Sequence, residues 1–164
     1  MSLLLHFKFI ILRISPFYFF LCLVMMSCNH AVIYDQKQDV SSPWKYSDTK
    51  DFTYEIKDTT LAYDLIISLE HSTHFSFENL YLNVKTIFPD GNFTSSPVSF
   101  QLADEKGDWA GECSGEKCNT EIDMASAAYF KSPGKYQLSF EQHSRNENLE
   151  GIHSIRIKVV KSKT

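Results

Sequence analysis

The chain has 164 residues, 43% of them hydrophobic, and a formal net charge of −4 at pH 7. It is too short for a multidomain enzyme, and the part after residue 27 is the length of one domain with one core. That part holds 14 basic and 20 acidic side chains, a formal charge of −6, which excludes the basic surface that binding to nucleic acid needs.

Residues 1–27 have the pattern of an export signal. Lys8 and Arg13 precede an almost entirely apolar run over 14–26, and the small residue Ser27 ends the segment. A positive start, a short apolar middle and a small residue at the cleavage site are typical of a secretory signal peptide. A transmembrane anchor is the alternative, but it needs about 20 apolar residues. We therefore predict that residues 1–27 are a signal peptide.

The next feature is a cysteine that follows this signal directly. Val24-Met25-Met26-Ser27-Cys28 resembles a bacterial lipobox, with Met25 where a lipobox prefers Leu. The resemblance implies that Cys28 is lipidated, and two or three acyl chains attach a protein stably because each buried CH₂ contributes about 0.8 kcal/mol. The alternative is a soluble secreted protein with a free cysteine. We expect a lipid-anchored protein of the cell envelope, on the outer membrane, with the periplasmic or surface face left open.

Residues 29–50 are polar and show little periodicity. Ser41-Ser42-Pro43 lies in the middle of this segment. We therefore predict that residues 28–50 are the lipidated N-terminus and a tether to the folded domain. Trp44 is the exception, because an indole in a tether usually docks on the domain it leads into.

From residue 51 the hydrophobic period changes to two, the period of half-buried β-strands. The segments that alternate are 61–70, 80–88, 136–141 and 155–160. Pro89-Asp90-Gly91 predicts a hairpin turn at 89–92, because Pro fixes φ and Gly accepts a positive φ. Frequent turn signals and the lack of a helical period favour about eight antiparallel strands. We predict an all-β, jelly-roll-like β-sandwich as a single domain over 51–164.

Cys113 and Cys118 flank the turn-forming tetrapeptide Ser114-Gly115-Glu116-Lys117. In an exported protein this spacing favours a disulfide across a hairpin, and so short a loop gives about 2 kcal/mol of stabilisation. A zinc half-site is the alternative, but a second pair of ligands is not evident nearby. The CxxC spacing of redox catalysts is absent.

Candidate metal and catalytic groups are scattered. On a strand, His71 and His74 would point to opposite faces, because three is an odd spacing. The acidic segment 104–108 crowds three carboxylates around a glycine, but without the spacing of a known Ca²⁺ loop. No GxSxG motif or defensible Ser, His and Asp cluster is present. We therefore expect no metal, no cofactor and no enzymatic activity.

Three stretches, in this order, resemble the GldH family of gliding-motility lipoproteins. They are Tyr34-Asp35 with Trp44, Asp48 and 52–59; then 79–82 with 88–91, 102–104 and 107–111; and last 136–142 with Arg145, Leu149 and Gly151-Ile152. Together with the lipobox they cover most of the chain after residue 27. Two details differ from the family, because Ser144 stands where Met is favoured and the Cys113/Cys118 pair is an addition.

This resemblance implies a lipid-anchored, non-enzymatic accessory of the gliding machinery and the linked type IX secretion system. Its partners would be the membrane, through acyl chains on Cys28, and other envelope proteins of gliding and secretion. Aromatic and Arg side chains dominate interface energetics, so Trp109 and Arg145 are the candidate interaction surface. The alternatives are core packing for Trp109 and a surface ion pair for Arg145.

A glycan-binding sandwich module on the cell surface is the main alternative function. It would show coplanar aromatic side chains on an open face beside Asp104 or Asp108. A hydrolase is a more distant alternative, because it would require a cleft that holds a carboxylate of raised pKa.

Overall fold

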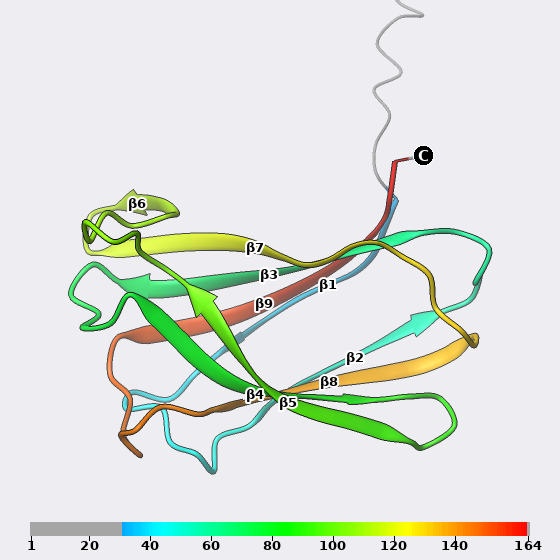
Figure 1. Cartoon of the computed structure of the whole chain (residues 1–164), viewed down its shortest axis with the longest axis horizontal. Helices are drawn as coiled ribbons and strands as arrows, with labels where there is room; N and C mark the ends of the chain where they lie inside the picture. Colours follow the sequence, from blue (N-terminus) through cyan, green and yellow to red (C-terminus); the bar gives the residue numbers. More distant parts are fainter. Residues whose placement is uncertain (1–30, 164) are drawn as a thin grey trace, which may run out of the picture.

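The computed structural model describes residues 31–163. The predicted signal peptide, residues 1–27, and the predicted lipidation site, Cys28, lie outside this range. The described chain forms nine strands (Figure 1), which are β1 (Val32–Asp39), β2 (Lys50–Ile56), β3 (Tyr63–Ser72), β4 (Asn79–Ile87), β5 (Phe93–Gln101), β6 (Glu112–Ser114), β7 (Lys117–Ala128), β8 (Gly134–Gln142) and β9 (Ile152–Lys161). Within residues 31–163 there is no helix long and apolar enough to cross a membrane.

The strands form two antiparallel sheets that pack face to face (Figure 1). One sheet has the order β1-β9-β3-β7-β6, and the other has the order β2-β8-β4-β5. Without the short edge strand β6, this is the eight-stranded double sheet of a jelly roll. The predicted jelly-roll-like β-sandwich is therefore confirmed.

The core lies between the sheets and comes from the alternation in the sequence. The side chains that point inward include Tyr63, Leu65, Ile67 and Leu69 of β3, Leu80, Leu82 and Val84 of β4, and Ile155, Ile157 and Val159 of β9. Each large side chain that is fully buried contributes about 1.5–3 kcal/mol through removal of apolar surface from water. Phe52 and Phe140 meet edge to face within this core, with ring centroids 5.8 Å apart.

The hairpin predicted at 89–92 joins β4 to β5. Ile87 and Phe93 are paired across it, and Gly91 has a φ of +84°. The Asp90 carboxylate accepts the backbone N–H of Asn92 at 3.0 Å, which is how Asp stabilises such turns. The Pro-Asp-Gly signal is thus confirmed.

The predicted tether over 28–50 is wrong for most of its length, because residues 32–39 form strand β1. This strand pairs with β9 along the edge of the larger sheet, from Val32 opposite Val160 to Asp39 opposite Ser154. An edge strand is held by main-chain hydrogen bonds and cross-strand side-chain pairs, so it needs little apolar periodicity. Asp35 forms one such pair, with two hydrogen bonds to Arg156 at 2.5 and 2.7 Å.

Trp44 docks on the domain, as the sequence predicted, and its side chain is fully buried. Its backbone exchanges two hydrogen bonds with Leu149, at 2.8 and 3.0 Å. The indole Nε1–H donates to the carbonyl oxygen of Asp48 at 2.7 Å. The folded domain therefore begins at β1, and the segment 40–49 is one of its packed loops.

The sandwich has two ends with different chain connections (Figure 1). We call the end where β1 starts the proximal end; it also carries the loops 57–62, 88–92 and 129–133 and the segment after β9. Hydrogen bonds from Lys161 N–H to Ala31 and from Ser162 N–H to Ala62 bring these segments together. The opposite, distal end carries the loops 40–49, 73–78, 102–111 and 143–151 and the β6–β7 turn.

Candidate docking groove

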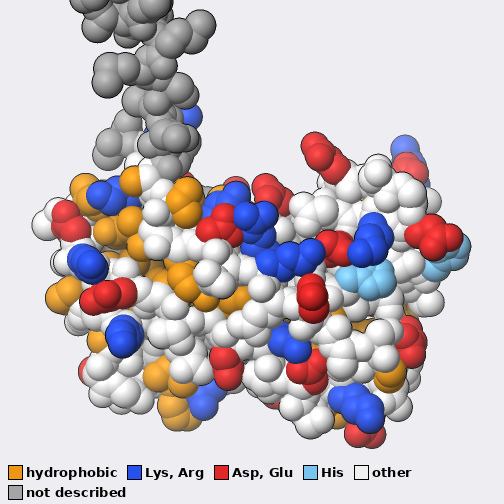
Figure 2. All heavy atoms as spheres, turned by 180° about the vertical axis from the view of Figure 1, so that it is seen from behind, with side chains coloured by type: hydrophobic (Ala, Val, Ile, Leu, Met, Phe, Trp, Pro, Cys, Tyr) orange, Lys and Arg blue, Asp and Glu red, His pale blue; other side chains and the backbone are white. Residues whose placement is uncertain are grey.

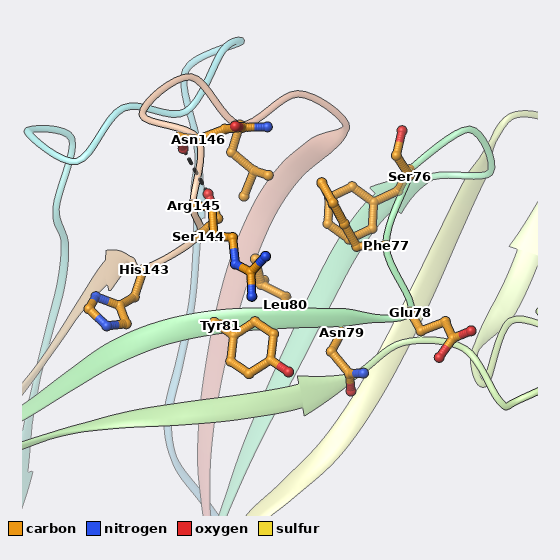
Figure 3. Close-up of a pocket in the computed structure, with 12 residues that line it drawn as sticks. Ser76, Phe77, Glu78, Asn79, Leu80, Tyr81, His143, Ser144, Arg145 and Asn146 are labelled. Atoms are coloured by element: carbon orange, nitrogen blue, oxygen red, sulfur yellow. Dashed lines mark hydrogen bonds between the residues drawn. The ribbon is translucent and has the colours of Figure 1, made fainter.

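A groove of about 760 Å³ lies at the distal end, between the start of β4 and the loop after β8 (Figure 3). It is larger than a second hollow of about 380 Å³ that lies over β2, β8 and β4. The residues that line it are Phe75, Ser76, Phe77, Glu78, Asn79, Leu80, Tyr81, His143, Ser144, Arg145, Asn146 and Leu149.

The groove exists because two neighbouring strands separate. β8 pairs with β4 from Gln137 opposite Ile87 to Gln142 opposite Leu82. Beyond that point His143 N–H still donates to Tyr81 O at 2.8 Å, and the loop 143–151 then turns away from the sheet. The first residues of β4 keep β5 as a neighbour on their other side, from Asn79 opposite Gln101 onward. The space that β8 leaves beside them is the groove.

The floor of the groove is apolar and buried, whereas two aromatic rings on its walls are exposed. Phe75, Leu80 and Leu149 are each 6% exposed or less. Phe77 and Tyr81 are 47% and 48% exposed, which is unusual for large rings. Phe77 packs edge to face on Phe75, with ring centroids 5.6 Å apart, so a buried ring supports an exposed one.

The loop that forms the other wall is held by the buried side chain of Gln142. Its Nε2 group donates to the carbonyl oxygens of Asn146 and Glu147, at 3.1 and 3.0 Å. Its Oε1 atom accepts the backbone N–H of Ser144 at 3.0 Å. Tyr46 OH adds a hydrogen bond to the Ser144 carbonyl at 2.7 Å. The wall that carries Arg145 is therefore fixed by hydrogen bonds before any partner binds.

The polar groups of the groove lie on its rim. Glu78, His143, Arg145 and Asn146 are all exposed to solvent. A catalytic acid or base is usually enclosed in a cleft, whereas these four side chains face solvent. Exposed aromatic rings, a buried apolar floor and an Arg at the rim are instead features of a binding surface.

Arg145 and Trp109, the two candidates from the sequence, are placed differently. Arg145 is exposed and lines the groove, and the ion pairs within residues 31–163 do not include it. Trp109 lies outside the groove, half-buried against the core. Its ring contacts that of His71, with centroids 4.6 Å apart, and His71 in turn contacts Phe75 at 6.1 Å. Trp109 thus supports the groove from behind, through two intervening rings.

His71 has a packing role in this row of rings. It is fully buried, and burial lowers its pKa by disfavouring the charged imidazolium. Its Nδ1 atom lies 3.0 Å from the Ser72 carbonyl, and its Nε2 atom lies 3.3 Å from the Thr120 hydroxyl. Both ring nitrogens are therefore satisfied by a neutral ring. Within the described residues, no group of three or more His, Cys, Asp and Glu side chains could hold a metal ion.

Sequence reasoning missed Phe77 and Tyr81. Tyr81 occupies an outward-facing position of β4, between the buried Leu80 and Leu82. The alternation of β4 predicts a polar side chain at this position. A large aromatic residue there was the signal that could have indicated a binding surface. Phe77 lies in a loop, where the sequence carries no comparable pattern.

The other predicted groups lie elsewhere. Cys113 and Cys118 face each other across the β6–β7 hairpin and form a disulfide. The Asp104 carboxylate accepts the backbone N–H groups of Lys106 and Asp108, at 2.9 and 3.0 Å, and so stabilises its own turn. Neither Asp104 nor Asp108 lines the groove.

Comparison with known proteins gives one consistent family. The family model described as GldH lipoprotein matches residues 32–159. A protein of Christiangramia forsetii named as a homologue of the gliding motility lipoprotein GldH is 24% identical over 152 residues, covering 88% of this chain and 93% of its own. The gliding motility lipoprotein GldH of Flavobacterium johnsoniae is 24% identical over 144 residues, with coverages of 84% and 89%.

The likeness to solved structures is distant. The crystal structure of an uncharacterised protein from Listeria monocytogenes aligns with 82% of this chain and 11% of its own, at 12% identity and a TM-score of 0.37.

Proposed function

The chain belongs to the GldH lipoprotein family, and we propose that it is a lipid-anchored, non-enzymatic accessory of the gliding-motility machinery and its linked type IX secretion system. It is held on the cell envelope, on the outer membrane, through Cys28, and it acts by binding other envelope proteins. The observation that carries this proposal is the rigid distal groove, with its exposed aromatic rings and Arg145.

The anchor is supported by the sequence around Cys28 and by the relatives. Both curated relatives are named lipoproteins, and each aligns with most of this chain. Acyl chains on Cys28 would keep the protein on the membrane without a spanning segment. The structure adds that the folded domain begins at Val32, four residues after this cysteine.

The binding role is supported by what the groove offers to a partner. Hot spots of protein interfaces are aromatic and Arg side chains, surrounded by contacts that exclude water. Phe77, Tyr81 and Arg145 place such groups around a buried apolar floor. Gln142 and Tyr46 already hold the loop 143–151. Binding of a partner would therefore cost little conformational entropy for ordering this loop.

Complementation of a deletion strain tests the proposal. Loss of the gene should reduce cell spreading and the secretion of adhesins, and the wild-type gene should restore both. The Cys28→Ala variant should leave the membrane fraction. The double variant Phe77→Ala/Tyr81→Ala should stay on the membrane but fail to restore spreading. Phe93→Ala is the matched control, because this ring is 61% exposed at the other end of the sandwich. Spreading and secretion that do not change on deletion would refute the proposal.

A glycan-binding module is the second candidate. The observation that favours it is the pair of exposed rings, Phe77 and Tyr81, beside the polar side chains of Glu78 and Asn79. Aromatic faces with neighbouring hydrogen-bonding groups also suit sugar rings. Binding of the wild-type protein on a glycan array, lost in Tyr81→Ala, would support this function. A glycan array that shows no binding would exclude this second function.

A further inference from the structure

We propose that the proximal end of the sandwich rests on the membrane surface, with Tyr129, Val32 and Ile33 in the headgroup region and nearby lysines on anionic lipids. This orientation rests on the proposed anchor at Cys28. It would place the docking groove at the far end of the molecule, pointing away from the bilayer.

The first argument is the length of chain between the anchor and the fold. β1 starts at Val32, so four residue steps separate it from Cys28. Even a fully extended chain covers about 3.3–3.6 Å per residue, so β1 starts no more than roughly 14 Å from the lipidated cysteine. A domain so close to its anchor cannot tumble freely, and its proximal end must face the bilayer.

The second argument is the apolar surface at this end. Tyr129 is 67% exposed, Val32 is 55% exposed and Ile33 is 36% exposed. Hydrophobic side chains gather at the left-hand end of Figure 2, which is the proximal end. Tyrosine is enriched where membrane and water meet, because its ring is apolar and its hydroxyl is polar.

The residues on either side of Tyr129 are held by contacts with the domain. The adjacent ring of Phe130 packs against Tyr136, with centroids 4.8 Å apart, and against Tyr63, at 5.6 Å. Asp64 accepts the backbone N–H of Ala127 at 2.8 Å, where the chain bends with a φ of +50°. The backbone on both sides of Tyr129 is therefore anchored, so this segment does not have to be ordered when the exposed ring meets lipid.

The third argument is the distribution of charge between the two ends. The loops and strand-terminal residues of the proximal end carry four lysines, Lys57, Lys131, Lys161 and Lys163, and two aspartates, Asp58 and Asp90. The same parts of the distal end carry five basic and ten acidic side chains. An anionic lipid surface attracts lysines and repels carboxylates within about a Debye length. The charge thus favours the same orientation as the anchor.

Fluorescence quenching in vesicles tests this orientation. The full lipidated protein is reconstituted in vesicles of phosphatidylethanolamine and phosphatidylglycerol in a 3:1 ratio, with a nitroxide quencher on some headgroups. A fluorophore is attached through Tyr129→Cys in one sample, through Lys131→Cys in a second, and through Phe77→Cys in a third. We expect strong quenching at positions 129 and 131 and little at position 77. Equal quenching at both ends would overturn the proposal.

Charge reversal gives a second readout. Lys131→Glu/Lys161→Glu/Lys163→Glu should reduce quenching at position 129, and Lys45→Glu/Lys106→Glu, at the distal end, should not. Circular dichroism confirms that each variant is folded. A protein that does not float with the vesicles would refute the anchor, and with it this orientation. A protein that floats with the vesicles but is not quenched at positions 129 and 131 would overturn the orientation alone.

Discussion

Arg156 holds Asp35 through two hydrogen bonds, and this pair joins β9 to the edge strand β1. The neighbouring guanidinium lowers the pKa of the Asp35 carboxyl. Few side chains of β1 are buried, so the strand depends on such cross-strand contacts and on its main-chain hydrogen bonds. β1 begins four residues after Cys28, the proposed lipidation site, so this pair helps to hold the segment nearest the proposed anchor in the sheet.

We predict that Arg156→Ala loosens β1 and leaves the rest of the sandwich intact. The side chains of Arg156 and Asp35 are 45% and 29% exposed, so solvent screening limits the loss to about 1 kcal/mol or less. Hydrogen exchange should become faster in β1 and stay unchanged in β3. Arg145→Ala is the control, because this exposed Arg lies outside the sheets. Faster exchange throughout both sheets would contradict the local role of the pair.

A second prediction concerns acid stability. Hydrogen bonds from Lys117, at 2.8 Å, and Lys37, at 2.7 Å, lower the pKa of Glu70 to about 2. A carboxyl with a lowered pKa stabilises the fold above its ordinary pKa of 4.5, and this contribution is lost as the pH falls toward 2. Glu70→Gln should therefore be less stable than wild type at pH 7, by about 1 kcal/mol. Urea unfolding at several pH values should show the difference shrinking below pH 4.5. A difference that stays constant down to pH 2 would contradict the assignment.

The third prediction concerns the Cys113–Cys118 disulfide. Closing so short a loop should stabilise the protein by about 2 kcal/mol, mainly by restricting the unfolded chain. Cys113→Ser/Cys118→Ser should lower the free energy of unfolding by that amount. Its complementation of spreading should be unchanged, since the hairpin does not line the groove. Alkylation of the unreduced, denatured protein followed by mass spectrometry tests the bond directly, because two labelled cysteines would show that it does not form.

A fourth prediction concerns the loop that carries Arg145. Gln142→Leu would leave the Asn146 and Glu147 carbonyls without the donor they now share. Asn146 and Glu147 are solvent-exposed and the Asn146 carbonyl also accepts a hydrogen bond from Ser144 Oγ, so water and Ser144 replace part of the lost donor and the cost should be about 1 kcal/mol, with a more mobile loop. Hydrogen exchange should rise over 143–149 before it rises elsewhere. Tyr46→Phe is the milder companion, because it removes only one hydrogen bond to Ser144. Unchanged exchange in both variants would show that the loop is held by other contacts.

The alternation in the sequence was enough to predict the sandwich, because strands such as β3 and β4 bury every second side chain. It was not enough for β1, whose burial is slight and whose partner, β9, lies at the far end of the chain. The groove was harder still to predict. Arg145 was a candidate on chemical grounds alone, and its neighbours Phe77 and Tyr81 come from a distant segment. The three side chains line one groove because β8 leaves β4 after Gln142 and the loop that follows faces the start of β4. This arrangement cannot be read from the alternation in the sequence.

Site-specific photo-crosslinking in living cells tests the central claim most directly. A photoreactive amino acid replaces Tyr81 in the groove, or Phe93 as the exposed aromatic control at the other end, in the membrane-anchored protein. We predict that position 81 crosslinks to a defined envelope protein of the gliding or secretion apparatus, that Arg145→Ala weakens this crosslink, and that position 93 does not form it. The same crosslinked products from both positions, or none from position 81 in cells that glide normally, would contradict the claim that the protein acts through the groove.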